Sequence, residues 1–210
     1  MQIHCGESIT TPIDCTARGA GQSQRRFSMT DFSTLPEKAQ TRLSKISESV
    51  SEVVPKEIKS WKIQTNSLAE DGQGPAIIDE VKEWYEKKCL YLYTFQITSQ
   101  NVAPLAVFSA YSDAKNGKKG DRAYARLNKE SEWLYVGSSK LIYQRLKDHL
   151  GYSSKQTYAI HLAYWARSID LEIKFECAKY PPGTSKIALQ VLEDTLWEEL
   201  LPMFGRQGVR

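Results

Sequence analysis

Residues 133–150 change from a strand pattern to a helical pattern of apolar positions within one short stretch. The first four residues are all apolar, which predicts a short buried strand. Gly137 ends this strand, and Ser139 has a side chain suited to capping a helix N-terminus. From Lys140 onward apolar residues recur at helical spacing as far as Gly151, a residue type that commonly ends helices. The pattern therefore predicts a strand, a tight turn and a helix.

The rest of the chain contains both alternating and helical segments, which together predict an α+β protein. Alternation of apolar and polar residues predicts strands over residues 89–97 and 171–177, and residues 61–66 could form a further short strand. Apolar residues at helical spacing predict helices over residues 34–50, 76–87, 104–111, 158–169 and 184–201. Residues 1–30 are rich in Ser, Thr, Gly and Gln without periodicity, which predicts a flexible N-terminal segment.

Composition narrows the class of protein. The chain has 210 residues, of which 41% are hydrophobic and 25% charged, and this suits one packed domain with an extension. The four cysteines are widely spaced without a CxxC pair, which predicts reduced thiols in a cytoplasmic protein. We find no secretory signal and no apolar run long enough to cross a membrane, so we expect no membrane partner. Nothing in the sequence indicates the oligomeric state.

Basic residues cluster in one part of a chain whose net charge is only +3. A nucleic-acid surface must therefore come from local clustering rather than from overall charge. The cluster lies in a glycine-containing stretch just before the 133–150 segment. Two interpretations of the cluster remain: a solvated loop, or a segment that contacts a nucleic-acid backbone. The residues that would make such contact are Lys118, Lys119, Arg122 and Arg126.

The 133–150 segment and its surroundings resemble the GIY-YIG nuclease family. Tyr135-Val136-Gly137 stands where the family has YIG, Arg145 follows eight residues after the glycine, and His149 four residues after the arginine. Cys89-Leu90-Tyr91 resembles the GIY strand with Cys in place of Gly. Tyr93 lies on the same face of that strand as Tyr91 and could fill the same role.

A glutamate near the end of the chain completes the resemblance. Glu193, followed by Pro202, resembles the helix that carries the family's metal-binding glutamate. Three features depart from the family pattern. Cys89 replaces the GIY glycine, residues 99–132 form a long insertion between the motif strands, and Gly205 stands where the family often has Asn. The resemblance implies a nuclease domain over residues 89–210, with residues 31–88 as a helical extension. It also implies a small, mainly antiparallel sheet of three strands flanked by helices.

The resemblance further implies a metal-dependent endonuclease that hydrolyses phosphodiester bonds in DNA, with double-stranded DNA favoured. The implied catalytic residues are Tyr91, Tyr135, Arg145, His149 and Glu193. Glu193 would bind Mg²⁺ or Mn²⁺, Arg145 would stabilise charge on the phosphate, and Tyr91 or His149 would orient the attacking water or take its proton. Nearby phosphates could be held by Ser138, Ser139 and Lys140.

These side chains should converge on one cleft, with Glu193 on the same side of the sheet as Arg145. Each also has a plainer interpretation. Glu193 could be a carboxylate at the edge of the core that pairs with a base, and Arg145 could be a surface arginine on an amphipathic helix. The alternative function is a protein of the same fold that binds nucleic acid without cutting it.

Overall fold

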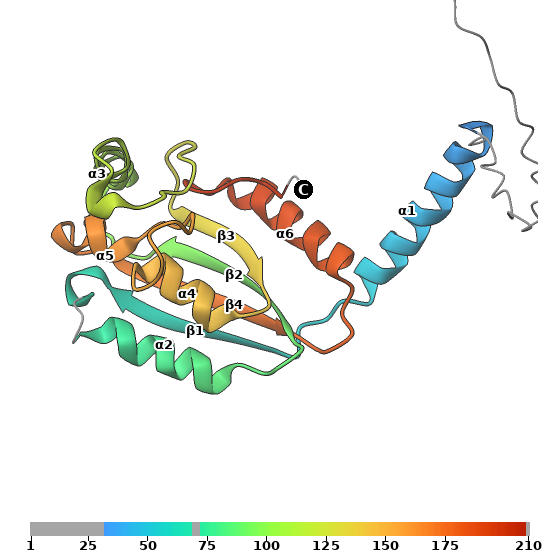
Figure 1. Ribbon diagram of the computed structural model, residues 1–210, viewed down its shortest axis with the longest axis horizontal. Helices are drawn as coiled ribbons and strands as arrows, with labels where there is room; N and C mark the ends of the chain where they lie inside the picture. Colours follow the sequence, from blue (N-terminus) through green and yellow to red (C-terminus); the bar gives the residue numbers. More distant parts are fainter. Residues whose placement is uncertain (1–31, 69–71, 209–210) are drawn as a thin grey trace, which may run out of the picture.

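The structure is a computed structural model that describes residues 32–68 and 72–208. The flexible segment expected over residues 1–30 lies outside the described residues, as do Cys5 and Cys15. The helices are α1 (Leu35–Ser51), α2 (Gln73–Trp84), α3 (Pro104–Asn116), α4 (Ile142–Leu150), α5 (Leu162–Trp165) and α6 (Lys186–Leu200). The strands are β1 (Glu57–Gln64), β2 (Leu90–Ile97), β3 (Trp133–Ser139) and β4 (Glu172–Tyr180), as Figure 1 shows.

The sheet has four antiparallel strands in the order β1-β4-β2-β3, so the expected number of three strands is wrong. The additional strand is β1, which pairs with β4 along its whole length. Residues 31–88 are therefore not a purely helical extension, because they add an edge strand to the sheet. Only Trp61 and Ile63 of β1 are buried. The first half of this strand therefore lacks the alternation by which strands are detected in a sequence.

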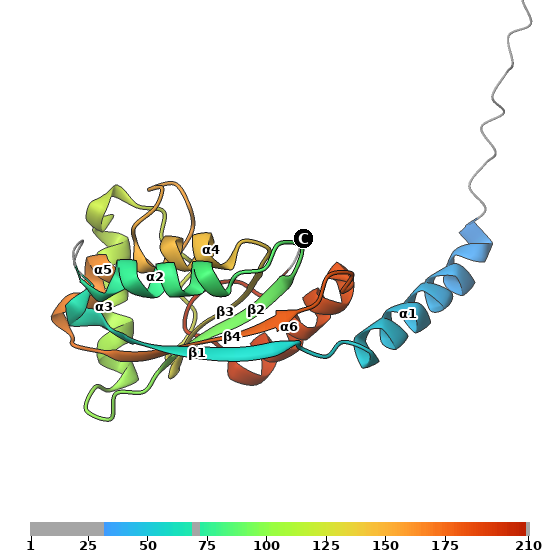
Figure 2. The ribbon, with the colours of Figure 1, turned by 90° about the horizontal axis from the view of Figure 1, so that it is seen from below.

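Helices cover both faces of this sheet. On one face, Tyr91, Tyr93 and Phe95 of β2 point into the main hydrophobic core. The other face carries Leu90 and Leu92, which pack with Leu189, Leu192 and Leu196 of α6 and with Tyr180. Figure 2 shows α2 and α4 on one side of the sheet and α6 on the other, close to β3. Alternation along β2 thus separates an aromatic layer under α4 from an aliphatic layer under α6.

The helix expected over residues 158–169 is mostly absent. Ala159 forms a bridge with Tyr124, so this part of the chain is extended. His161 has a φ of 50°, in the left-handed region, and α5 begins only after it. Helical structure is limited to α5 and one following 3-10 turn, Ala166–Ser168. The apolar residues at helical spacing are buried here by an irregular segment, which a periodicity argument cannot distinguish from a helix.

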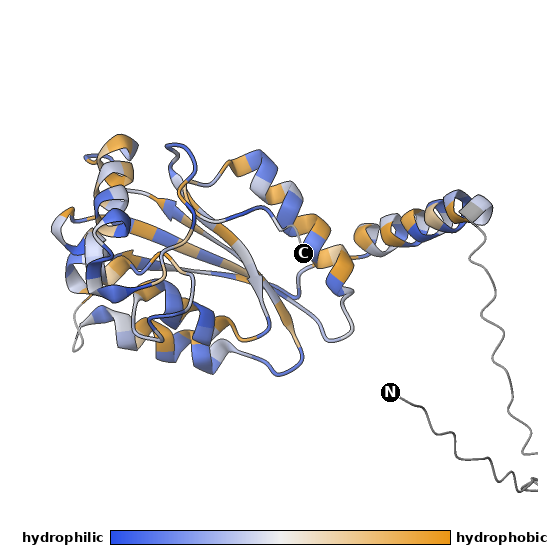
Figure 3. Ribbon diagram, turned by 45° about the horizontal axis from the view of Figure 1, so that its top comes forward, coloured by the Kyte–Doolittle hydropathy of each residue, from blue (hydrophilic) through white to orange (hydrophobic). Residues whose placement is uncertain are grey.

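Helix α1 projects away from the sheet, as Figure 2 shows. None of its described side chains is buried, although orange, apolar positions recur along it in Figure 3. None of the helices within residues 32–68 and 72–208 has the length and apolar character needed to cross a membrane.

Candidate active site

The turn between β3 and α4 sets the geometry of the site. Ser139, expected as the helix cap, instead stabilises the turn: its Oγ accepts a hydrogen bond of 3.0 Å from the backbone N–H of Leu141, which is the N-cap residue of α4. Gly151, with a φ of 102°, closes α4 in the left-handed conformation that glycine favours. Between them, the helix places Arg145 and His149 one turn apart and directs both toward β2 and β3.

Tyr93 and Tyr135 lie side by side on adjacent strands, with ring centroids 6.1 Å apart and ring planes inclined by 10°. Gly137 pairs with Tyr93 across the two strands. A Cβ atom at position 137 would lie 2.8 Å from both the Tyr93 hydroxyl and Cε1 of Tyr135. The glycine is therefore required because the two tyrosine rings occupy the space that any side chain would need.

Arg145 links the two tyrosines. Its Nε donates a hydrogen bond to the Tyr93 hydroxyl at 3.2 Å, and its Nη2 donates one to the Tyr135 hydroxyl at 3.1 Å. Its Nη1 lies 3.6 Å from Oδ2 of Asp148, and the side chain is 22% exposed. The guanidinium is therefore fixed in one orientation and still reaches solvent, which suits it to binding an anion.

His149 is fully buried behind the tyrosines. Its Nδ1 accepts a hydrogen bond of 3.4 Å from the backbone N–H of Ile160, which leaves the ring proton on Nε2. Nε2 lies 3.0 Å from the Tyr93 hydroxyl and is the donor to it. Burial, and next the charge of Arg145, lower the pKa of His149 well below its ordinary value. A neutral imidazole without access to solvent acts through Tyr93 and does not contact a substrate water directly.

The Tyr93 hydroxyl oxygen thus accepts hydrogen bonds from both Arg145 and His149. Its own hydrogen is free to be donated elsewhere. Burial raises the pKa of Tyr93 and the charge of Arg145 lowers it, with burial the larger effect. The group is therefore a neutral phenol at physiological pH, although two donors are in place to stabilise a phenolate.

Tyr91, the tyrosine expected in the site, lies outside this cluster. Its hydroxyl accepts a hydrogen bond of 2.7 Å from the Glu86 N–H and donates one of 3.2 Å to the Glu86 carbonyl. Burial raises the pKa of Tyr91 to about 12. Tyr93 occupies the position expected for Tyr91. Both residues share one face of β2, and only the pairing of Tyr93 with Gly137 distinguishes them, which the sequence does not reveal.

Glu193 was expected on the same side of the sheet as Arg145. This expectation is wrong, because α6, which carries Glu193, packs on the opposite face. The side chain is 5% exposed, and its Oε2 accepts a hydrogen bond of 2.5 Å from Ser138 Oγ. Ser138 follows Gly137 on β3, which is the edge strand of the sheet. The Glu193 carboxylate therefore lies near this edge of the sheet. The charge of Glu193 also raises the pKa of Tyr93, so the two groups interact across this edge.

A cleft of about 1740 Å³ opens beside Tyr135 and Arg145. Its lining contains five basic residues, Lys115, Arg126, Lys129, Arg145 and Arg206, and three carboxylates, Glu130, Glu132 and Glu199. Of the expected nucleic-acid contacts, Arg126 is therefore at the cleft, while Lys119 and Arg122 line a different cavity. Lys118 lines neither of these two spaces. Lys140 is exposed at the end of β3, where the neighbouring Lys186 ammonium lowers the pKa of Lys140.

The sequence argument did not single out Asn128. Its Nδ2 donates hydrogen bonds to the carbonyls of Pro202 at 3.0 Å and Gly205 at 3.2 Å, which fixes the segment after α6 against the cleft. Gly205 has a φ of 102°, and a Cβ there would lie 2.9 Å from Cε2 of Tyr135. An asparagine at position 205 would collide with that ring, which explains the departure from the family pattern.

Comparison with known proteins identifies this arrangement. The family model described as the GIY-YIG catalytic domain matches residues 123–183. Residues 123–183 are thus similar to a GIY-YIG catalytic domain. The match includes β3, α4 and β4, whereas β2 with Tyr93 and α6 with Glu193 lie outside it. No curated protein and no solved structure matches the chain. The match to this catalytic domain indicates nuclease activity in general.

The buried His149 makes the stability of the protein depend on pH. Its folded pKa is lowered, so below about pH 6.5 the unfolded chain binds a proton that the folded chain excludes. We expect the unfolding free energy to fall by up to about 1.4 kcal/mol per pH unit from this group as the pH decreases from 6.5. Urea unfolding at pH 7.5, 6.0 and 5.0 measures the slope. His149→Gln should flatten it, and equal slopes in both proteins would contradict the assignment.

Proposed function

We propose that the protein is a metal-dependent endonuclease that hydrolyses phosphodiester bonds in double-stranded DNA. The observation that carries the proposal is the hydrogen-bonded cluster in which Arg145 joins Tyr93 and Tyr135 beside a basic cleft. A surface arginine on an amphipathic helix would not be held by two tyrosine hydroxyls from two strands.

Glu193 suits a Mg²⁺ or Mn²⁺ site completed by waters and substrate phosphates, rather than a site formed by protein ligands alone. Within the described residues, no group of three or more His, Cys, Asp or Glu side chains is arranged to hold a metal ion. Mg²⁺ is commonly held by one or two carboxylates together with waters and substrate phosphates, so a single buried glutamate beside Ser138 Oγ is a suitable donor set. When bound, the ion supplies Lewis-acid stabilisation of charge on the phosphate oxygens.

The side chains of the cluster have distinct roles in this proposal. Arg145 binds the reacting phosphate with its exposed side and stabilises the charge that develops there. Once its phenol proton has been lost to solvent, the Tyr93 oxygen orients the attacking water and takes its proton, because the two donors on that oxygen stabilise the phenolate. His149 positions Tyr93, and Tyr135 holds Arg145 at the wall of the cleft.

The excess of basic over acidic residues in the cleft lining supports DNA as the substrate. Arg126 and Lys129 are exposed and come from the insertion before β3, and Arg206 follows α6. Cations from separate segments along one cleft suit the regularly spaced phosphates of a nucleic-acid backbone. We also place the protein in the cytoplasm, because Cys89 and Cys177 are free thiols and a reducing compartment keeps them so.

A supercoiled plasmid tests this function. We expect conversion to nicked and linear forms with Mg²⁺ or Mn²⁺, and none with EDTA. Gel-shift binding measured on the same DNA in EDTA separates cutting from binding. DNA binding without cleavage under either metal would favour the alternative, a non-cleaving nucleic-acid-binding protein of this fold.

Arg145→Lys keeps the positive charge and removes the two hydrogen bonds that the fork makes to the tyrosines. We expect the single-turnover cleavage rate to fall about a hundredfold, because a lysine cannot hold the phosphate and both hydroxyls at once. Arg42→Lys on the exposed helix α1 is the matched control and should cut at the original rate. Unchanged cleavage in Arg145→Lys would remove this residue from the reaction.

A further inference from the structure

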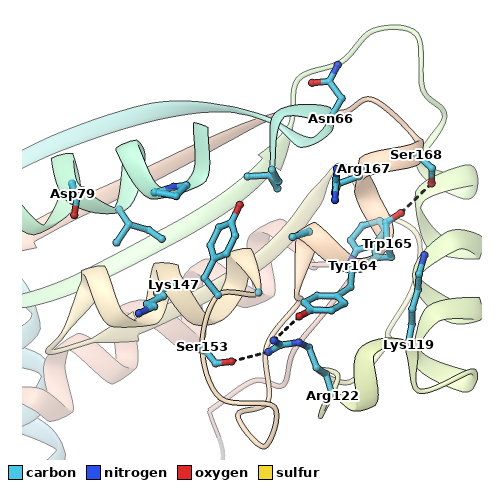
Figure 4. Close-up of a pocket in the computed structure, with 16 residues that line it drawn as sticks. Asn66, Asp79, Lys119, Arg122, Lys147, Ser153, Tyr164, Trp165, Arg167 and Ser168 are labelled. Carbon is cyan, nitrogen blue, oxygen red and sulfur yellow. Dashed lines mark hydrogen bonds between the residues drawn. The ribbon is translucent and has the colours of Figure 1, made fainter. Parts of the chain in front are cut away.

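A second cavity, of about 1060 Å³, lies on the far side of α4 from the cluster. Lys147 of α4 lines it, two residues from Arg145 and so on a different face of the helix. The remaining walls come from α2, from α5 with the turn after it, and from the segments that flank Gly120 and Ser153. The cavity is therefore separate from the cleft but shares one helix with the candidate active site (Figure 4).

The charge of this cavity is not balanced. Its lining contains four cations, Lys119, Arg122, Lys147 and Arg167, and one carboxylate, Asp79. None of the four cations takes part in an ion pair within the described residues. Figure 4 shows Lys147 and Asp79 across the cavity from Lys119 and Arg167. A concave site with an excess of unpaired cations favours an anionic ligand.

Arg122 is held in a fixed orientation in this wall. Its Nη1 donates to the Ser153 carbonyl at 2.9 Å, and its Nη2 donates to the Tyr164 hydroxyl at 2.7 Å. The guanidinium lies over the Tyr164 ring, with its Cζ 4.3 Å from the ring centroid. The Nε atom of Arg122 is buried without a hydrogen-bond partner. An arginine that is held in this way presents a pre-ordered positive charge in the cavity lining.

The Tyr164 ring is itself fixed. A Cβ at Gly120 would lie 2.5 Å from one edge of the ring, and a Cβ at Gly151 would lie 3.1 Å from the other. Both glycines have positive φ, so the backbone approaches the ring closely on both sides. The aromatic wall is therefore rigid and is present before any ligand binds.

Apolar and aromatic groups make up much of the remaining lining: Leu68, Pro75, Ile78, Tyr152 and Trp165. A hydrated backbone phosphate alone would make no apolar contact with these side chains. A ligand that carries both phosphates and flat apolar rings matches both parts of the cavity. In a duplex the bases are stacked in the interior, so only unpaired nucleotides present both parts together.

We propose that this cavity binds unpaired nucleotides of the nucleic-acid substrate, with phosphates at the four cations and a base against the aromatic wall. This inference rests on the proposed function, whose substrate it specifies: a duplex that carries a single-stranded segment. The segment would leave the duplex near the cleft and pass α4 to reach the cavity.

Fluorescence anisotropy in EDTA tests the inference with two labelled DNA probes, a blunt duplex and the same duplex with a single-stranded overhang. We expect the full-length protein to bind the overhang probe about tenfold more tightly, in line with the effect of stacking one or more bases. The double variant Lys147→Glu/Arg167→Glu should lose this preference. Lys155→Glu, an exposed lysine of a neighbouring loop outside the cavity lining, is the control and should keep it.

Equal affinity of the original protein for both probes would overturn the proposal. So would equal loss of preference in Lys155→Glu and in the double variant, because the effect would then come from overall charge. Cleavage is followed separately with Mg²⁺. If the preference depends on the cavity but no DNA is cut, the cavity assignment stands and the nuclease function fails. If blunt DNA is cut and the overhang has no effect, the nuclease function stands and the cavity assignment fails.

Discussion

Glu193→Gln should reduce DNA cleavage by at least about a thousandfold, because it removes the negative charge that would bind the metal and keeps the shape of the side chain. Glutamine can still accept the hydrogen bond from Ser138 Oγ, so we expect the fold to survive. Single-turnover cleavage of a plasmid with Mg²⁺ measures the loss, and urea unfolding checks the fold.

Glu198→Gln is the matched control for this change. Glu198 lies on the same helix and is exposed, so the substitution makes the same change in charge away from Ser138. We expect it to cut at the original rate. Cleavage by Glu193→Gln at that rate would show that this carboxylate binds no catalytic metal and would return Glu193 to a structural role at the edge of the core.

Tyr93→Phe should reduce cleavage by about a thousandfold, within the range expected for loss of a group that transfers a proton. The substitution removes the oxygen that accepts hydrogen bonds from Arg145 and His149. Tyr91→Phe removes a hydroxyl from the same face of the same strand, and that hydroxyl also makes two hydrogen bonds. The two variants should lose similar stability in urea unfolding, while only Tyr93→Phe loses activity.

The comparison of these two variants decides between the two possible alignments of the first motif strand. If Tyr91→Phe is the inactive protein and Tyr93→Phe cuts normally, the reacting groups do not lie in the cluster around Arg145. Equal loss in both would show that buried hydroxyls on β2 affect activity through stability alone.

The central part of the site could be predicted because it is local in the sequence. The strand, turn and helix of residues 133–150 place Tyr135, Arg145 and His149 through fixed spacing, and the structure brings all three together. Local spacing also predicted the end of α4 at Gly151. These features depend on backbone geometry within a few residues.

Features that depend on pairing between distant segments were not predictable. The choice of Tyr93 over Tyr91 depends on the register between β2 and β3, and alternation alone leaves both tyrosines on the same face. The fourth strand depends on pairing with β4, and only two of the eight residues in β1, Trp61 and Ile63, are buried in the way that indicates a strand. The side from which Glu193 approaches depends on the packing of α6 against Leu90 and Leu92.

The segment after α6 has a further consequence through its contact with β3. Strand β3 lies at the edge of the sheet, and the backbone N–H groups of Met203 and Phe204 donate to the carbonyls of Trp133 and Leu134. Met203 and Phe204 are themselves fully buried. Their hydrogen bonds cover the beginning of this edge, which would otherwise be open to pairing with strands of other molecules. A chain shortened before Pro202 would expose this edge together with the apolar surface beneath it, and we expect it to aggregate.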